Sequence, residues 1–131
     1  MSAERVLVDT SVWVDYFKGD SPVVSEKVDR FLSEADVCVP QIVLAELIQG
    51  AKSDREVSVI EDIQEAFTII DQGPETWMKA GKLSRRLRSR GKTIHLIDCY
   101  IAVIADESRC ALLTLDDHFQ EIRKVLPLRL L

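Results

Sequence analysis

The sequence contains little of what marks membrane, secreted or disordered proteins. No apolar run approaches the roughly 18 residues needed to cross a bilayer, and the first residues lack the basic and then apolar layout of a signal peptide. Glycine and proline number only five and four, and no polar low-complexity tract interrupts the aliphatic residues spread along the chain. These absences predict that all 131 residues fold as one domain, residues 1–131, with no membrane partner.

Cysteine is also scarce. The three cysteines, Cys38, Cys99 and Cys110, are widely spaced, and each stands in an apolar context. An odd number at this spacing fits neither a disulfide framework nor a paired zinc-ligand motif. We therefore expect buried thiols in a reducing compartment and a cytoplasmic protein.

Positive charge is in deficit, because 17 Lys and Arg residues face 22 Asp and Glu residues and the net charge is −5. Phosphate binding needs a positive surface, so the chain cannot hold nucleic acid by its overall charge, and any contact must be local. One dense basic stretch is either such a contact or a solvated helix face that complements the helix dipole. It comprises Lys79, Lys82, Arg85, Arg86, Arg88, Arg90 and Lys92.

Short apolar runs alternate with amphipathic stretches, which is typical of βα units and predicts an α/β fold with a mainly parallel sheet. Strands are predicted at residues 5–8, 37–39, 68–70 and 111–115, with an edge strand at 128–131. The first predicted helix runs from a cap at Thr10 or Ser11 to Gly19, and the second begins at Pro22. A capping box of Ser53 and Glu56 begins another helix, and Pro74 begins a long one that ends at Gly91. Further helices are predicted at residues 42–48, 97–105 and 119–125.

Acidic residues stand where the chemistry of such a sheet is usually found. Asp9 ends the first predicted strand, and Asp116 follows a later one, so both can face a pocket beyond the carboxyl ends of the strands. Glu46 and Asp98 are each embedded in an apolar helix with no Lys or Arg nearby to pair with. Bringing carboxylates together without cations is unfavourable unless a metal ion neutralises them.

Carboxylates without His or Cys partners suit Mg²⁺ or Mn²⁺ rather than zinc. Such ions activate water and bind phosphoryl oxygens in nucleases. Taken singly, Asp9 can cap a helix, Glu46 can form a buried salt bridge, Asp98 can cap a helix, and Asp116 can serve a turn. Their joint placement favours a metal site.

The residues around these acids also carry a family resemblance, which covers essentially the whole chain. It rests on Val8-Asp9-Thr10-Ser11-Val12-Trp13, Leu44-Ala45-Glu46-Leu47, Gly91-Lys92-Thr93-Ile94-His95-Leu96-Ile97-Asp98 and Leu113-Thr114-Leu115-Asp116-Asp117-His118-Phe119. In this order the segments resemble the PIN-domain ribonucleases, and within them the VapC toxins of bacterial and archaeal toxin–antitoxin pairs.

The resemblance implies a three-layer α/β/α fold and an endoribonuclease that uses Mg²⁺ or Mn²⁺. It assigns the catalytic and metal-binding roles to Asp9, Glu46, Asp98 and Asp116. It also implies an RNA substrate, a homodimer, and a cognate antitoxin that inserts a segment into the site. Thr10 or Ser11, together with Thr114, resemble the hydroxyl residues that orient carboxylates or water.

An RNA substrate changes the interpretation of the basic stretch, because an acidic pocket still needs cations nearby to hold the RNA backbone. Candidate RNA contacts are Arg85, Arg86, Arg88, Arg90 and Lys92.

The chain departs from the family pattern at one position. Many members carry a further acid just before the aromatic residue, where this chain has His118, with Asp117 one step earlier. Asp117 either substitutes for that acid or points into solvent, and we slightly favour solvent. We expect His95 and His118 to be surface histidines without a catalytic role.

Two other classes of protein share part of this acidic pattern. Aspartyl-phosphate phosphatases and receiver domains also place an Asp at the end of the first strand. Phosphatases need a second Asp where Ser11 stands, and receivers need a Lys that does not closely follow Leu113. The stronger alternative is a catalytically weak PIN-like module that binds protein or RNA, but such domains typically lose acids and this chain has all four.

Overall fold

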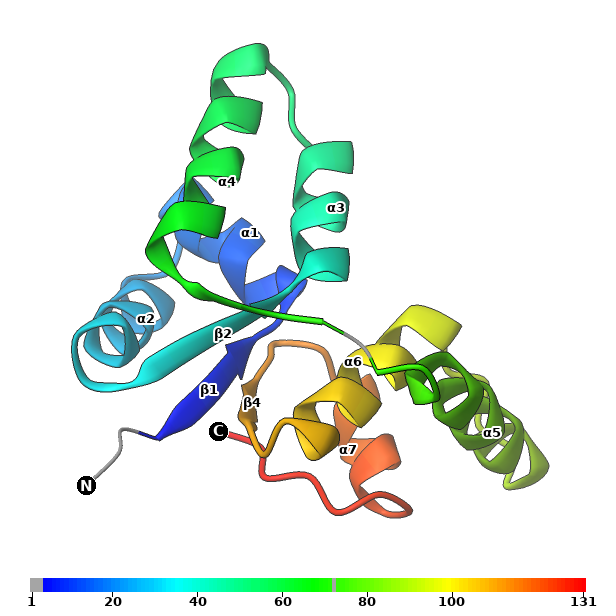
Figure 1. Cartoon of the computed structure of the whole chain (residues 1–131). Helices are drawn as coiled ribbons and strands as arrows, with labels where there is room; N and C mark the ends of the chain where they lie inside the picture. Colours follow the sequence, from blue (N-terminus) through cyan, green and yellow to red (C-terminus); the bar gives the residue numbers. More distant parts are fainter. Residues whose placement is uncertain (1–3, 72) are drawn as a thin grey trace.

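The computed structural model describes residues 4–71 and 73–131, and strands and helices alternate along most of the chain (Figure 1). The strands are β1 (Arg5–Val8), β2 (Asp36–Pro40), β3 (Thr68–Ile70) and β4 (Ala111–Leu113). The helices are α1 (Thr10–Lys18), α2 (Pro22–Glu34), α3 (Gln41–Gln49), α4 (Asp54–Ala66), α5 (Thr76–Ser89), α6 (Leu96–Glu107) and α7 (His118–Arg123). The predicted α/β class is confirmed.

The four strands form one sheet in the order β3-β2-β1-β4, and every pair is parallel. The side chains of Val6, Leu7 and Val8 in β1 are fully buried, as expected for a central strand of a parallel sheet. Val8 pairs with Leu113 of β4, and the Asp9 amide donates to the Leu113 carbonyl at 2.9 Å. Asp9 and Thr114 therefore leave the sheet side by side.

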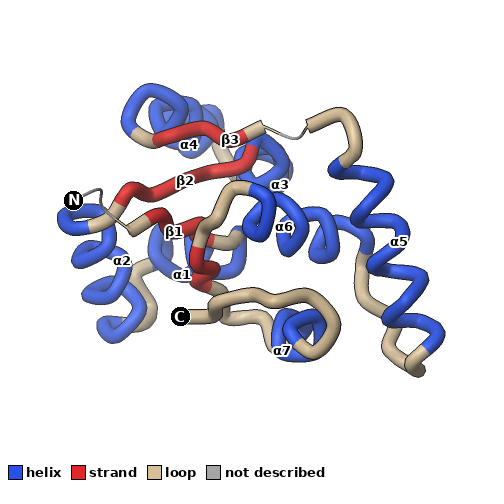
Figure 2. Tube along the Cα trace, turned by 60° about the horizontal axis from the view of Figure 1, so that its bottom comes forward, coloured by secondary structure: helices blue, strands red, loops and turns tan. Residues whose placement is uncertain are grey.

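The helices form two groups around this sheet. In one group α1 contacts α2 and α3, and α3 contacts α4; in the other α6 contacts α5 and α7. In α6, residues 99–105 are all buried, because a helix that is apolar on every side must lie in the core. Helix α5 packs against α6 at the margin of the molecule (Figure 2). Helices α3 and α4 stand side by side and enclose a groove together with α1 (Figure 1). The three cysteines are buried and free, as predicted.

One helix start and one capping motif differ from the sequence prediction. Helix α1 begins after Asp9 rather than after Thr10 or Ser11, and the Asp9 side chain makes no capping hydrogen bond. At α4, Ser53 Oγ accepts from the Glu56 amide as predicted, but Glu56 accepts from the Lys52 amide instead of completing a capping box. In the first case the carboxylate of Asp9 is left available to other partners.

The C-terminal elements are shorter than predicted. Strand β4 ends at Leu113 instead of Leu115, because the Leu115 amide donates to Ser11 Oγ at 3.1 Å. Helix α7 spans His118–Arg123 instead of 119–125, and the predicted edge strand at 128–131 is reduced to one bridge between Leu112 and Leu130. Within the described part of the chain, no helix combines the length and apolarity that crossing a membrane would require.

Candidate active site

Asp9 is buried at the carboxyl end of β1, and two hydroxyl groups hold its side chain. Ser11 Oγ donates to Asp9 Oδ2 at 2.8 Å, and Thr114 Oγ1 donates to the same oxygen at 2.9 Å. Both bonds fall on Oδ2, so the orientation of the carboxylate is set by residues from α1 and from the end of β4. The second oxygen, Oδ1, is left for another partner.

Thr114 connects Asp9 to Asp116. While its hydroxyl donates to Asp9, the same oxygen accepts from the Asp116 amide at 3.0 Å. Asp116 in turn accepts from the His118 amide at 2.9 Å, as expected of an acid that begins a turn. The turn after β4 is thus built from hydrogen bonds that link the backbone of Asp116 to Asp9 through Thr114.

Glu46 reaches the same region from α3. Its Oε1 accepts from Thr10 Oγ1 at 2.8 Å, so a hydroxyl at the start of α1 orients it. Burial raises the pKa of Glu46; the bond from Thr10 opposes this rise, and the charges of Asp9 and Asp98 add to it. Glu46 therefore shares an electrostatic environment with acids from two other elements.

Asp98 lies in the first turn of α6, and its side chain is 19% exposed. Burial raises the pKa of Asp98, the hydrogen bond from His118 lowers it, and the charges of Asp116 and Asp9 raise it further. His118 Nδ1 lies 3.2 Å from Asp98 Oδ2 and 3.2 Å from Asp116 Oδ1. His118 is at the surface as expected, with its side chain 46% exposed, but its ring also contacts two acids of the cluster.

The composition of this cluster fits a divalent metal ion. Hydroxyl groups, backbone amides and one imidazole are the partners of the acids, and within the described residues no Lys or Arg side chain pairs with Asp9, Glu46, Asp98 or Asp116. Ligand atoms of Asp98, Asp116 and His118 all lie within 4.8 Å of one another. Oxygen-rich sites with several carboxylates suit Mg²⁺ and Mn²⁺, which would also relieve the repulsion that raises the pKa values.

The remaining predicted site residues are spread around this cluster. Asp117 is exposed at the start of α7. The basic residues at the end of α5 are exposed as well, and two of this group contact the α7 region: Lys92 Nζ lies 4.0 Å from Glu121 Oε1, and an Arg86 amine donates to the Val125 carbonyl at 3.5 Å. Their part in RNA binding stays a prediction.

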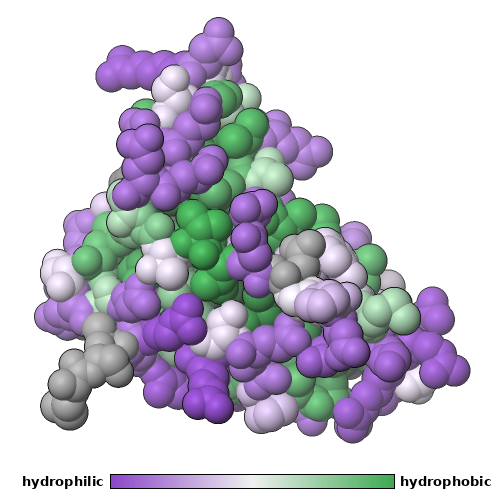
Figure 3. Space-filling model, viewed as in Figure 1, coloured by the Kyte–Doolittle hydropathy of each residue, from purple (hydrophilic) through white to green (hydrophobic). Residues whose placement is uncertain are grey.

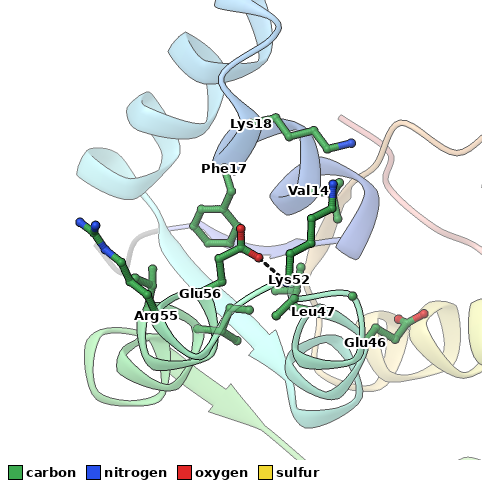
Figure 4. A pocket seen from close by; sticks show the side chains of 12 residues that line it. Val14, Phe17, Lys18, Glu46, Leu47, Lys52, Arg55 and Glu56 are labelled. Carbon is green, nitrogen blue, oxygen red and sulfur yellow. Dashed lines mark hydrogen bonds between the residues drawn. The ribbon is translucent and has the colours of Figure 1, made fainter.

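An apolar groove of about 390 Å³ adjoins the acidic cluster between α1, α3 and α4. Phe17, Leu47 and Val59 are among the apolar residues that line it, and Lys18 and Arg55 stand at its edge (Figure 4). Glu46 lies at the side of the groove with its carboxylate directed toward α6 (Figure 4). The groove and the acidic cluster thus share a residue.

The parallel sheet and the carboxylates gathered at its carboxyl edge define an α/β protein with an acidic site of the metal-binding type. The family model of the PIN domain matches residues 6–125, which is nearly the whole chain. The chain therefore belongs to the PIN-domain family.

Individual relatives agree with this assignment. Ribonuclease VapC2 of Haemophilus influenzae is 31% identical over 130 residues, which cover 95% of each protein. The structure of VapBC-1 from nontypeable Haemophilus influenzae matches with a TM-score of 0.78 at 23% identity, over 97% of this chain and 96% of that one. VapBC-5 from Mycobacterium tuberculosis, a member of the VapBC family of toxin–antitoxin systems, matches with a TM-score of 0.66 at 19% identity, over 97% of each chain. At these identities the two structures establish the fold.

Proposed function

We propose that this protein is a metal-dependent endoribonuclease and the toxin of a toxin–antitoxin pair. The observation that carries the proposal is the gathering of Asp9, Glu46, Asp98 and Asp116 at one edge of the sheet, where their partners are hydroxyl groups, backbone amides and one imidazole rather than Lys or Arg. Relatives named VapC ribonuclease support RNA as the substrate.

Asp9, Asp98 and Asp116 would hold Mg²⁺ or Mn²⁺, which when bound lowers the pKa of a water molecule for in-line attack on a phosphodiester. Ser11 and Thr114 keep Asp9 in one orientation, so the carboxylate needs no rearrangement when the substrate arrives. Glu46, whose pKa is raised by burial, takes the proton of the attacking water. Hydrolysis of this kind leaves 5′-phosphate and 3′-hydroxyl ends.

The partner of such a toxin is a cognate antitoxin, and the groove between α1, α3 and α4 offers it a surface. Apolar side chains gather between α3 and α4 and over the middle of the face seen in Figure 3, whereas polar side chains cover α5. A segment of the antitoxin that packs in this groove reaches the acidic cluster at Glu46. A homodimer of the toxin completes the proposed assembly.

Cleavage of a mixed RNA pool by the purified protein in Mg²⁺ or Mn²⁺ tests the proposed activity, with EDTA and Asp98→Asn as controls. We expect cleavage that both controls abolish, and product ends of the hydrolytic type. Products with 2′,3′-cyclic phosphate would contradict the hydrolytic scheme. A protein that binds the metal, is free of antitoxin and cleaves none of the RNAs would instead be a binding module.

A further inference from the structure

His118 lies inside the acidic cluster but has no part in the proposed reaction. Its Nδ1 is equidistant, at 3.2 Å, from one oxygen of Asp98 and one of Asp116. A half-exposed histidine has room to turn toward water, yet this ring faces two carboxylates from different elements. One nitrogen and two carboxylate oxygens therefore lie within 4.8 Å of one another.

The backbone around His118 is held at the edge of the cluster. The His118 amide donates to the carboxylate of Asp116 at 2.9 Å, which closes a short turn. The next residue, Phe119, is fully buried and anchors the start of α7 in the core. Its neighbours thus fix the backbone from which the imidazole extends, and the ring nitrogen lies beside Asp98 and Asp116.

The separations fit a shared metal ion. In an octahedral site with ligands at about 2.1 Å, adjacent ligand atoms lie roughly 3.0 Å apart. The two distances from Nδ1 to the carboxylate oxygens, both 3.2 Å, are close to this value. A protonated imidazole that donates its single Nδ1–H to Asp98 beside the charge of Asp116 would produce the same distances, so an experiment must separate a ligand from a counter-ion.

We propose, building on the proposed metal-dependent function, that His118 is a direct metal ligand beside Asp98 and Asp116. Mg²⁺ strongly prefers oxygen ligands, whereas imidazole nitrogen is a good ligand for transition metals. The nitrogen at this position therefore makes the site select Mn²⁺ over Mg²⁺, in contrast to an acid at the same place.

The proposal is tested by electron spin-echo spectroscopy of Mn²⁺ bound to the full chain, which detects nitrogen bonded to the ion. The chain has two histidines, so His95→Gln is the matched control for His118→Asp. We expect a nitrogen coupling in the wild type and in His95→Gln that disappears in His118→Asp. Labelling the wild-type histidines with the heavy nitrogen isotope should change the coupling, which tests the assignment without any substitution.

Calorimetric titration with Mn²⁺ and with Mg²⁺ provides the second measurement. Because His118→Asp replaces a nitrogen ligand by an oxygen that Mg²⁺ accepts readily, the ratio of Mn²⁺ to Mg²⁺ affinity should fall by about tenfold in this variant. Mn²⁺ that binds without nitrogen coupling would overturn the inference and leave the metal site standing. Failure of Mn²⁺ to bind at all would overturn both the inference and the metal dependence of the proposed function.

Discussion

Asp98 is more costly to ionise in the folded chain than in water. Burial raises the pKa of Asp98 above its ordinary value of 3.8, and the charges of Asp116 and Asp9 add to the rise against the opposing bond from His118. The folded chain therefore keeps a proton that the unfolded chain has already released. This favourable contribution is fully present below pH 3.8 and is lost as the pH rises through the raised pKa of the folded state.

Asparagine at position 98 does not titrate, so Asp98→Asn should remove the loss of folding stability that the wild type shows as the pH rises. We expect the metal-free variant to unfold at a higher temperature than the wild type at pH 7, although it has lost cleavage. Thermal unfolding in EDTA across the pH range checks this. Asp106→Asn, an exposed acid on the same helix, is the control and should behave as the wild type. A metal-free Asp98→Asn variant that is less stable than the wild type at pH 7 would contradict the electrostatic account.

The hydroxyl group of Thr114 donates to the carboxylate of Asp9 and accepts from the backbone amide of Asp116, so this residue should matter without touching the metal. Thr114→Val keeps the shape of the side chain but removes the bonds to Asp9 and to the Asp116 amide. We expect metal affinity to fall ~10–100-fold and cleavage to weaken, with the fold retained by circular dichroism. The exposed Thr93, changed to Val, is the control. Unchanged metal affinity in Thr114→Val would show that Ser11 alone orients Asp9.

Helix α5 presents its charges unevenly along its length. Near its start, Lys79 pairs with Glu107 at 2.8 Å, whereas Arg88 and Arg90 are exposed at its end and Lys92 Nζ, just beyond, lies 4.0 Å from Glu121 of α7. We predict that changing Arg88, Arg90 and Lys92 together to Gln weakens RNA binding, and that each lost phosphate contact lowers the slope of log affinity against log salt by about 0.7.

This prediction is measured by RNA titration at several salt concentrations in an Asp98→Asn background, where substrate is not cleaved. Lys79→Gln in the same background is the matched control, because its partner Glu107 stands at the other end of α6 from Asp98. An equal loss of log affinity per charge removed in the two variants would mean that overall charge, rather than the end of α5, governs binding.

Helix α4 contributes Val59 to the apolar groove, and this valine is half exposed. A carboxylate there would be buried by any segment that packs in the groove, at a cost that a bound apolar partner cannot offset. We expect Val59→Asp to lose antitoxin binding while RNA cleavage continues, as measured by calorimetry and by the RNA assay. Val23→Asp on α2 is the control, since Val23 is exposed away from the groove. Retained antitoxin affinity in Val59→Asp would place the partner elsewhere.

At the scale of the whole molecule, several apolar side chains remain uncovered on α5 and α6. Trp77 stacks on Tyr100 with ring centroids 4.0 Å apart, and Leu96 is exposed at the start of α6. Large apolar side chains of this kind are typical of surfaces that associate. We predict a homodimer with twice the mass of one chain in sedimentation, and Leu96→Lys should shift it toward the monomer. Val23→Lys should leave it a dimer, and a wild type that sediments as a monomer would contradict the proposed assembly.

The main features of the fold were accessible from the sequence because they depend on local signals. The apolar run of residues 5–8 and the Pro22 start of α2 occur as predicted, and the apolar residues of α6 form the expected buried helix. Boundaries that depend on distant partners were not accessible. Strand β4 ends early because the Leu115 amide bonds to a hydroxyl 104 residues away in the chain. No local pattern in the sequence encodes such a contact.

The sequence by itself determined the α/β class and the acidic residues at strand ends and in apolar helices, since period, caps and unpaired buried charge are properties of short segments. Only the tertiary structure decided which atoms meet. It sets both hydroxyl bonds on one oxygen of Asp9, and it turns the ring of His118 toward Asp98, which lies 20 residues earlier in the chain. The direction of a half-exposed side chain depends on the packing of whole elements, here α6 against α7, and this packing is established only when the sheet and its helices have assembled.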